Sequence, residues 1–569
     1  MLRYRAETAA DREAFVYVGE SGAYDAEQRL TFGQLDAAAR QLGGWLSAHL
    51  PASGAGRRVL LLYPPGLDFL VAYFGCLYAG AVAVPAPLPE GPRIQQERVM
   101  RILADCGANL VLTDAPDRLP TLPDAPQVVA TASTDVLTGQ WQPPRLRPGS
   151  LAMLQYTSGS TSSPRGVLLS HDAMLANLAL TNGRLRHDEA SRLVTWLPFY
   201  HDMGLTQVLS MVYVGGWAAV MSPTAFLKRP HRWLELISHY RASTATAPNF
   251  GYDLCARRVT DEQLTGVDLS SWTAALNGSE PVSAAALDAF TKRFEPYGFR
   301  HAAHYPCYGM AEATVFVSGG DRDTAPVIRH VVTEQYEANR LVPAEPGQHT
   351  RPLVGCGTPV DYDVRIVDPD SGRTLPPGAI GEIWLRGPSI GAGYWGRPVE
   401  SAATFDARTA DGDGGYLRTG DLGALLDGEL FVTGRRKEML VVHGRNLYPY
   451  DIEAEVRRLD PALGQTVGAV FAVGTDDQRV AVVHEVRGQL DSERAHELAA
   501  AIRELVTRNF GVAVGAVALL RPGQVPRTTS GKIQRGRTRE LFLAGQLGTL
   551  HEESMPGLRP ADDSSGARA

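Results

Sequence analysis

The stretch Tyr156-Thr157-Ser158-Gly159-Ser160-Thr161-Ser162-Ser163-Pro164-Arg165-Gly166 is the most unusual run in this sequence of 569 residues. It follows a short apolar segment, Leu151–Leu154, of the kind that forms a buried strand. Its hydroxyls, glycines and terminal cation suit a polyphosphate, because glycine permits close backbone approach and a guanidinium pairs with phosphate oxygens. An exposed Ser/Thr-rich loop is the plainer alternative. The run lacks the pattern GxxxxGK[ST], so it is not the phosphate loop of kinases and GTPases.

A second unusual segment, Pro526-Arg527-Thr528-Thr529-Ser530-Gly531-Lys532, lies near the end of the chain. It places Lys532 after a flexible turn and before a short expected helix, and a lysine offers a compact cation on a long stem. Together the two segments predict an enzyme that binds ATP between two domains, with Lys532 supplied by the smaller one.

Composition excludes several classes of protein. The length predicts two to four structural units, and 44% hydrophobic with 21% charged residues is typical of a soluble globular protein. A net charge of -7 gives no reason to expect nucleic acid or an anionic membrane as partner. Five scattered cysteines without a CxxC pair, and an N-terminus without an apolar core, predict a cytoplasmic protein. The uncharged run Phe69–Val84 contains two glycines and is short for a membrane span, so we expect a buried helix and strand there.

The order of expected elements predicts an α/β fold. Residues Thr31 and Gln34 have capping-box spacing ahead of a helix reaching Leu50. Further helices are expected up to residue 79 and over 94–106, and strands over 59–63, 81–84, 109–113, 193–197, 218–221 and 274–277. Strands that alternate with helices indicate parallel sheets covered on both faces.

The pattern of expected strands and helices changes twice along the chain. We expect an N-terminal α/β core over 1–354, a small β-rich, β-barrel-like subdomain over 355–436, and a small mobile α+β domain over 437–546. Residues 547–569 are polar and rich in Pro, Gly and Ser, and are predicted to be a disordered tail.

Six motifs in order resemble those of the adenylate-forming superfamily, which includes acyl-CoA synthetases, luciferases and peptide-synthetase adenylation domains. They are the run 156–166, Asn277-Gly278-Ser279-Glu280-Pro281, Tyr308-Gly309-Met310-Ala311-Glu312, Tyr416-Leu417-Arg418-Thr419-Gly420-Asp421, Gly434-Arg435-Arg436-Lys437-Glu438 and the PRTTSGK segment. Their order and their spread along the chain make the resemblance far more specific than any single motif.

The resemblance implies a role for each motif. Thr157–Arg165 would hold the phosphates of ATP, Gly278–Glu280 the adenine, and Tyr308 would stack on it, with Gly309, Met310 and Ala311 beside it. Glu312 would bind Mg²⁺ and Asp421 the ribose hydroxyls, with Arg435 bracing the sugar or phosphates. Lys437 would be the hinge between domains, and Lys532 the catalytic lysine. Plainer roles exist: a core tyrosine at 308, an exposed acid at 312, a turn aspartate at 421.

Within the superfamily, Trp196-Leu197-Pro198-Phe199-Tyr200-His201-Asp202-Met203-Gly204-Leu205 resembles the fatty acyl-AMP ligases, as does Ala245–Phe250. That branch implies His201 between the acyl pocket and the nucleotide, ATP and Mg²⁺ as cofactors, and a fatty acid and the phosphopantetheine arm of an acyl carrier protein as partners. Ser162, Arg165 and Ala311 replace the usual glycine, lysine and threonine. At Ala311 this puts one α-phosphate contact in doubt.

An extra segment at about 324–353 also resembles that branch. Its apolar residues predict a packed insertion rather than a loose loop. In fatty acyl-AMP ligases such an insertion is thought to limit movement of the C-terminal domain and to disfavour CoA. A neutral surface elaboration is the alternative.

Other functions remain open at this stage. An acyl-CoA synthetase would share every ATP motif. An amino-acid-activating domain would need an acid for the α-amine, which we cannot locate, and a non-catalytic binding protein would not need Glu312, Asp421 and Lys532 together. Residues 387–391 fit the hydrolase pattern GxSxG, but the following residues, which include Gly393, Gly396 and Pro398, do not fit the helix that a nucleophile elbow requires.

Overall fold

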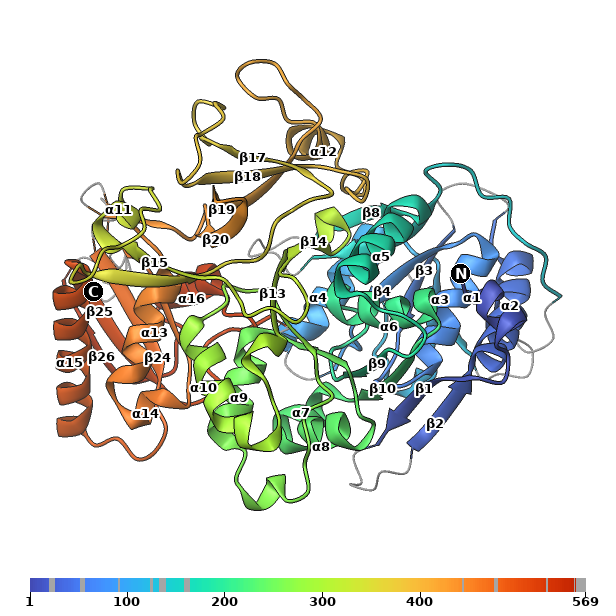
Figure 1. Ribbon diagram of the computed structural model, residues 1–569, viewed down its shortest axis with the longest axis horizontal. Helices are drawn as coiled ribbons and strands as arrows, with labels where there is room; N and C mark the ends of the chain where they lie inside the picture. The colour runs from blue at the N-terminus through green and yellow to red at the C-terminus, as the bar shows by residue number, and fades with distance from the viewer. Residues whose placement is uncertain are drawn as a thin grey trace, which may run out of the picture.

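The computed structural model describes residues 1–19, 26–51, 57–90, 93–122, 126–131, 140–157, 164–442, 445–474, 479–528, 531–556 and 558. Two sheets form the core of the N-terminal part (Figure 1). The first has the order β14 (Phe316–Gly319), β13 (His304–Gly309), β12 (Ala274–Asn277), β11 (Thr244–Ala247), β9 (Arg192–Thr195), β10 (Trp217–Met221), β1 (Glu13–Val18), β2 (Ala26–Thr31). The second has the order β6 (Gln127–Ala130), β5 (Leu110–Thr113), β3 (Arg58–Leu62), β4 (Val82–Ala86), β7 (Leu151–Tyr156), β8 (Gly166–Ser170). Only the edge strands β2, β8 and β14 are antiparallel, so the expected α/β class with parallel sheets is confirmed.

The helices that cover these sheets begin and end where the sequence indicates. In α2 (Phe32–His49) the Thr31 side chain accepts from the Gln34 amide, and the Gln34 side chain accepts from the Thr31 amide. Helix α3 (Asp68–Ala79) ends at Gly80, which has a φ of 65°. The uncharged run therefore forms a buried helix followed by β4. No helix in the described ranges is both long and apolar enough to cross a bilayer.

The expected β-barrel-like subdomain is an open sheet. Strands β17 (Asp363–Val367), β18 (Gly381–Arg386), β19 (Leu417–Leu426) and β20 (Glu429–Arg435) pair antiparallel in that order. A barrel closes only when the first and last strands of the sheet pair with each other. Here β17 and β20 are the two edge strands, and they do not pair. Strand β19 begins at Leu417, so it carries the TGD motif within it.

The insertion at about 324–353 is folded, as predicted. It contains β15 (Ile328–Val332) and the short helix α11 (Thr333–Glu337), and β15 pairs with β16 (Thr350–Val354). Val331, Tyr336 and Leu341 are buried in one apolar cluster with side chains of β19 and β20 and with Tyr448 of the C-terminal domain. The insertion therefore packs against two parts of the molecule at once.

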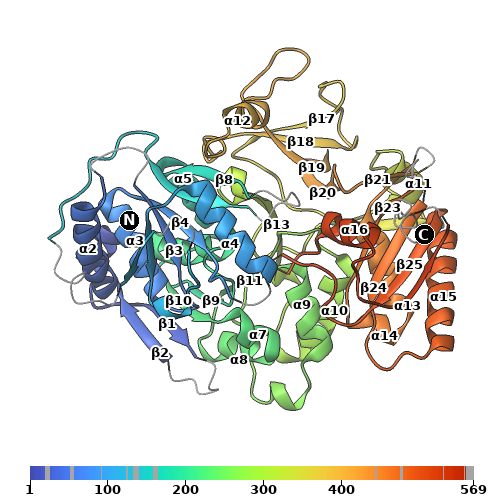
Figure 2. The same cartoon turned by 180° about the vertical axis from the view of Figure 1, so that it is seen from behind.

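The C-terminal domain lies beside α9 (Asn249–Arg258) and α10 (Ala284–Phe294), at one end of the molecule (Figures 1 and 2). Its sheet has the order β23 (Gly468–Val473), β24 (Arg479–Glu485), β25 (Ala513–Leu520), β26 (Thr549–Ser554), and its helices include α13 (Pro449–Leu459), α15 (Ser492–Phe510) and α16 (Arg535–Leu543).

The prediction of a disordered tail from residue 547 is wrong for Thr549–Ser554. These residues form strand β26, which pairs antiparallel with the buried strand β25. The Arg503 guanidinium also donates to the Glu553 carbonyl at 2.8 Å. The polar sequence hid this strand because an edge strand can satisfy its backbone through its neighbour while its side chains stay in water.

Arg535, the first residue of α16, joins three parts of the C-terminal domain. Its guanidinium donates two hydrogen bonds to Glu453 of α13, both at 2.7 Å, and a third to Glu438 at 2.6 Å. Glu438 directly follows the expected hinge residue. The start of α16, helix α13 and the hinge segment are thereby tied together.

Candidate active site

The site lies at the carboxyl ends of β12 and β13, where ligands bind in open α/β sheets. Strand β12 ends at Asn277 and continues into Gly278–Glu280, while β13 ends at Gly309 and continues into the turn Met310–Glu312. A Cβ at Gly309 would lie 1.7 Å from the Val315 carbonyl, so only glycine fits there. Ser279 adopts a φ of 71°, an uncommon conformation for a residue with a side chain.

Lys532 reaches this edge from the C-terminal domain. Its amide donates to Thr528 Oγ1 at 3.1 Å and its carbonyl accepts from the Thr528 amide at 2.8 Å, which fixes the turn that carries it. A Cβ at Gly531 would lie 3.1 Å from the ring of Phe250, so the turn rests against α9. Burial and the nearby cation of Arg435 lower the pKa of Lys532. The expected approach of Lys532 to the N-terminal domain is present in this structure.

Three carboxylates act electrostatically on the Lys532 amine and favour its charged form: Asp202, Glu280 and Asp421. Glu280 accepts from the Phe250 amide at 2.9 Å, and burial raises its pKa above the usual range. These acids come from three separate segments, each of which stands out in the sequence. For Asp202 itself, however, no role was predicted.

Asp421 is buried and bonded through both oxygens. Oδ2 accepts from the Tyr308 hydroxyl at 2.9 Å, and Oδ1 lies 3.0 Å from Arg435 Nε. The charge of Asp421 raises the pKa of Arg435. Tyr308, Asp421 and Arg435 are therefore one connected unit, as a shared nucleotide site requires.

Glu312 is half-buried, and its carboxyl has a partner that the sequence did not reveal. The Tyr394 hydroxyl donates to its Oε1 at 2.9 Å, and burial raises the pKa of Glu312. Tyr394 also lies beneath Arg165, whose guanidinium carbon is 5.4 Å from the ring centroid. Arg165 in turn pairs with Glu400 at 2.9 Å.

Cations gather on the phosphate side of the site. Partial burial of the amine and the neighbouring charges of Arg165 and Arg435 lower the pKa of Lys437. At the start of the predicted phosphate loop, the Thr157 amide donates to the Arg165 carbonyl at 3.2 Å. Ser158, Gly159, Ser160 and Thr161, which were predicted to bind phosphate, lie outside the described residues. The mutual repulsion of the cations favours an anionic ligand.

His201 stands at the beginning of α6 (Asp202–Val214). Its Nδ1 lies 2.7 Å from Asp202 Oδ1. Burial alone would raise the pKa of Asp202, but His201 and Lys532 outweigh it and hold that pKa below its usual range. Asp202 thus connects His201 with Lys532 electrostatically.

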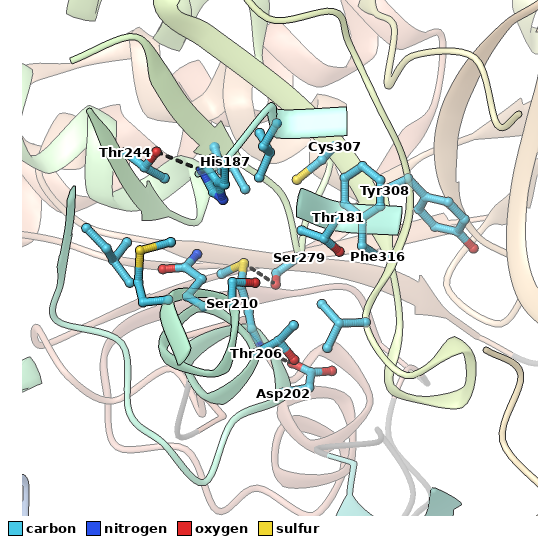
Figure 3. A pocket seen from close by; sticks show the side chains of 18 of the residues that line it. Thr181, His187, Asp202, Thr206, Ser210, Thr244, Ser279, Cys307, Tyr308 and Phe316 are labelled. Atoms are coloured by element: carbon cyan, nitrogen blue, oxygen red, sulfur yellow. Dashed lines mark hydrogen bonds between the residues drawn. The ribbon is translucent and has the colours of Figure 1, made fainter. Parts of the chain in front are cut away.

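A largely apolar cavity opens beside these residues (Figure 3). It passes between α6 and α5 (His171–Leu185). Asp202, Ser279, Tyr308, Gly309 and Met310 line it on the nucleotide side. The sequence did not predict that Tyr308, Gly309 and Met310 also line this cavity, while Ala311 is buried behind them.

Ser389, the serine of the GxSxG pattern, is no exposed nucleophile. It is 1% exposed, and its Oγ bonds to Tyr362 and accepts from Asn177 at 3.0 Å. Its carbonyl accepts from Thr314 at 2.7 Å. Ser389 joins the four-stranded sheet to the core.

Comparisons with known proteins agree with this geometry. The chain matches the AMP-binding enzyme family over residues 2–395, and a Disco-interacting protein 2-like AMP domain over residues 437–552. It is 40% identical over 568 residues to the medium-chain-fatty-acid–[acyl-carrier-protein] ligase JamA of Moorena producens, covering 96% of this chain and 95% of the relative.

Two solved structures are similar over almost the whole chain. The fatty acyl-adenylate ligase from L. pneumophila, in complex with acyl adenylate and pyrophosphate, has a TM-score of 0.74 at 34% identity, covering 97% of both chains. A structure from a study of fatty acyl-adenylate ligases from E. coli and L. pneumophila has a TM-score of 0.85 at 31% identity, covering 95% of this chain and 97% of the other. The chain therefore belongs to the AMP-binding enzymes, in the branch of the fatty acyl-AMP ligases.

Proposed function

We propose that this protein activates a fatty acid with ATP and then transfers the acyl group to the phosphopantetheine thiol of an acyl carrier protein. The observation that carries the proposal is that Lys532 of the C-terminal domain lies close enough to Asp202, Glu280, Asp421 and Arg435 to interact with them electrostatically, and that Asp202 also lines the cavity. A cation at that junction can contact both an acyl carboxylate and a phosphate.

In the first step an oxygen of the fatty-acid carboxylate attacks the α-phosphorus of ATP. The bond to the bridging oxygen of the β-phosphate breaks, and pyrophosphate leaves. Lys532 neutralises the charge that develops and holds the attacking oxygen in line. Tyr308, Asp421 and Arg435 hold the nucleoside, while Arg165 and the 157–165 segment hold the departing phosphates.

The residues around Glu312 fit a magnesium ion. Glu312 is a hard oxygen donor, and its raised pKa means that the protein compensates its charge only in part, which a divalent cation would correct. Bound there, Mg²⁺ would neutralise the β- and γ-phosphates. Tyr394, through its hydrogen bond, fixes the orientation of the carboxylate.

In the second step the carrier thiolate attacks the acyl carbonyl carbon, the bond to the AMP oxygen breaks, and AMP leaves. Lys532 must first withdraw to admit the thiol, and we assign the pivot to Lys437. The insertion bears on this step because it holds the C-terminal domain: Arg445 lies 2.6 Å from Glu337, and Arg351 pairs with Asp451. These contacts support the proposal that free CoA is a poor acceptor.

Pyrophosphate–ATP exchange with a panel of fatty acids tests the first step. Incubation of enzyme, ATP and an accepted acid with either holo-carrier protein or CoA tests the second. We expect exchange and carrier loading, with little acyl-CoA. Failure of exchange with every carboxylic acid would contradict the proposal, and efficient acyl-CoA formation would identify an acyl-CoA synthetase instead.

A further inference from the structure

The far part of the cavity is polar in a way that a plain alkyl chain does not explain. The cavity follows α6 away from the nucleotide, and Ser210 lies eight residues beyond Asp202, about 12 Å along the helix axis. Its lining reaches Thr244, the first residue of β11. Thr244 lies at the amino end of its strand, whereas Asn277 lies at the carboxyl end of the neighbouring strand β12. The cavity therefore holds the chain of the acid, with the carboxylate at the Asp202 end.

Three buried side chains that line this cavity have no hydrogen-bond partner within the described part of the protein. They are Thr181 of α5 and Gln207 and Ser210 of α6. They are 7%, 9% and 2% exposed, and for Gln207 both the amide nitrogen and the amide oxygen are unpaired. Buried polar groups in folded proteins are normally paired, so these groups await a partner in the cavity.

The neighbouring polar residues His187 and Thr244, unlike these three, do have hydrogen-bond partners. His187 Nδ1 lies 3.0 Å from Asn182 Oδ1 and Nε2 lies 2.9 Å from Thr244 Oγ1, and the two side chains lie away from Asp202 and Tyr308 (Figure 3). Burial lowers the pKa of His187 to about 4, so the ring is neutral. No lysine or arginine is among the described residues that line the cavity, so a second carboxylate on the substrate would find no cationic partner in the lining.

We propose that the preferred substrate carries a hydroxyl group on the distal part of its chain, bound by Gln207 and Ser210 with Thr181 nearby. A hydroxyl both donates and accepts, so it can satisfy the Gln207 amide oxygen and nitrogen at once, whereas a keto oxygen would leave the amide oxygen unpaired. The inference rests on the proposed function, because it takes the cavity to be the acyl site.

The test is a comparison of matched acids in pyrophosphate–ATP exchange. Unsubstituted acids of six to twelve carbons are compared with their terminal hydroxy counterparts, and phenylalkanoates with 4-hydroxyphenylalkanoates. We expect at least one hydroxylated acid to exceed its partner in kcat/KM by about tenfold or more, because the partner leaves buried polar groups unpaired. The aliphatic and phenolic series distinguish which kind of hydroxyl fits.

Variants locate the effect. Gln207→Met and Ser210→Ala should each lower the preference for the hydroxylated acid, and Gln207→Met should raise kcat/KM for the unsubstituted one. Ser318→Ala is the matched control, since Ser318 Oγ is also buried and unpaired but Ser318 does not line the cavity. It should leave the ratio between the two acids unchanged.

The outcomes separate the two proposals. Exchange that is equal with and without the hydroxyl at every length, or a preference that survives both Gln207→Met and Ser210→Ala, would overturn the inference alone. Absence of exchange with every acid would overturn the proposed function and the inference with it.

Discussion

Lys532 is a residue of one domain whose charge is used in the other. Its amine is buried among groups of the N-terminal domain, including Asp202 and Glu280, while its backbone belongs to the turn at 528–532. A lysine placed in this way contributes to the reaction only while the two domains are together.

Substitution of this lysine should separate binding from chemistry. We expect Lys532→Ala to slow pyrophosphate–ATP exchange by about 10²–10³, because removal of a preorganised charge has effects of that size. ATP affinity, measured by calorimetry, should change little. Lys292→Ala on the exposed face of α10 is the control. Exchange at the wild-type rate in Lys532→Ala would disprove the assignment.

The lowered pKa of Lys532 predicts a pH dependence. Lys532 binds its proton less tightly in the closed site than in water, so rising pH removes the charge on which adenylation depends, and it does so below the ordinary lysine pKa of about 10.4. The profile of kcat/KM for ATP should therefore fall on the alkaline side. In Lys532→Arg the guanidinium stays protonated, and that fall should disappear even if the rate is lower. An unchanged alkaline limb would assign the titration to another group.

For Ser389 we predict the opposite result, in which substitution lowers the stability of the protein and leaves its activity unchanged. Ser389→Ala removes the two buried hydrogen bonds that Ser389 Oγ makes with Asn177 and Tyr362, and should lower the free energy of unfolding by about 1–3 kcal/mol, as measured in urea. The exchange rate should be unaffected. Loss of exchange in a fully stable variant would reopen a catalytic role for this serine.

At this scale the sequence predicted residues within motifs and missed their distant partners. Lys532, Glu280, Asp421 and Arg435 were recognised because each stands in a short run of unusual composition, and the structure brings them together. Tyr394 and Glu400 carry no such local signal, because their positions depend on contacts made across the fold. Asp202 does lie in a recognisable motif, but only the fold shows that it and Lys532 interact electrostatically.

At the scale of elements, the insertion acts on the C-terminal domain through a few contacts. Tyr336 and Tyr448 lie with ring centroids 5.2 Å apart, and the buried Glu337 pairs with Arg445. A buried pair that loses one member leaves an uncompensated charge, so either partner is a sensitive point.

We expect Glu337→Gln to loosen the C-terminal domain and raise the yield of acyl-CoA relative to acylated carrier by roughly fivefold or more. The measurement is a competition between CoA and holo-carrier protein after acyl-AMP has formed. Glu334→Gln changes an exposed acid of the same helix and should have no effect. If the product ratio stays constant in Glu337→Gln, the insertion does not control the acceptor.

Elements with clear end signals could be predicted from the sequence, and those defined by pairing could not. The capping box at Thr31 and Gln34 located the beginning of α2. Strand β26 and the openness of the β17–β20 sheet depend on which strands lie next to each other, and strand neighbours are set by tertiary packing.

At the scale of the whole molecule, the proposed mechanism assigns the present arrangement, in which Lys532 acts on groups of the N-terminal domain, to the first step. It assigns the second step to an arrangement reached by rotation about Lys437. Lys437→Pro fixes the backbone φ at the pivot and restricts residue 436. We expect exchange to remain within about threefold of wild type, and carrier loading from preformed acyl-AMP to fall by roughly tenfold or more.

Lys437→Ala, which keeps the backbone free, is the control for the lost charge. Equal effects of the proline on both steps, or none on either, would refute a hinge at this position.

The three hydrogen bonds of Arg535 set how this rearrangement can proceed. They connect Glu438, the residue after Lys437, to α16, the helix that follows the Lys532 turn. The turn that carries Lys532 and the segment after the hinge residue must then move together as one rigid body. Lys532 then leaves the site only when the whole C-terminal domain rotates. Its distance from the site and the angle between the two domains therefore change together.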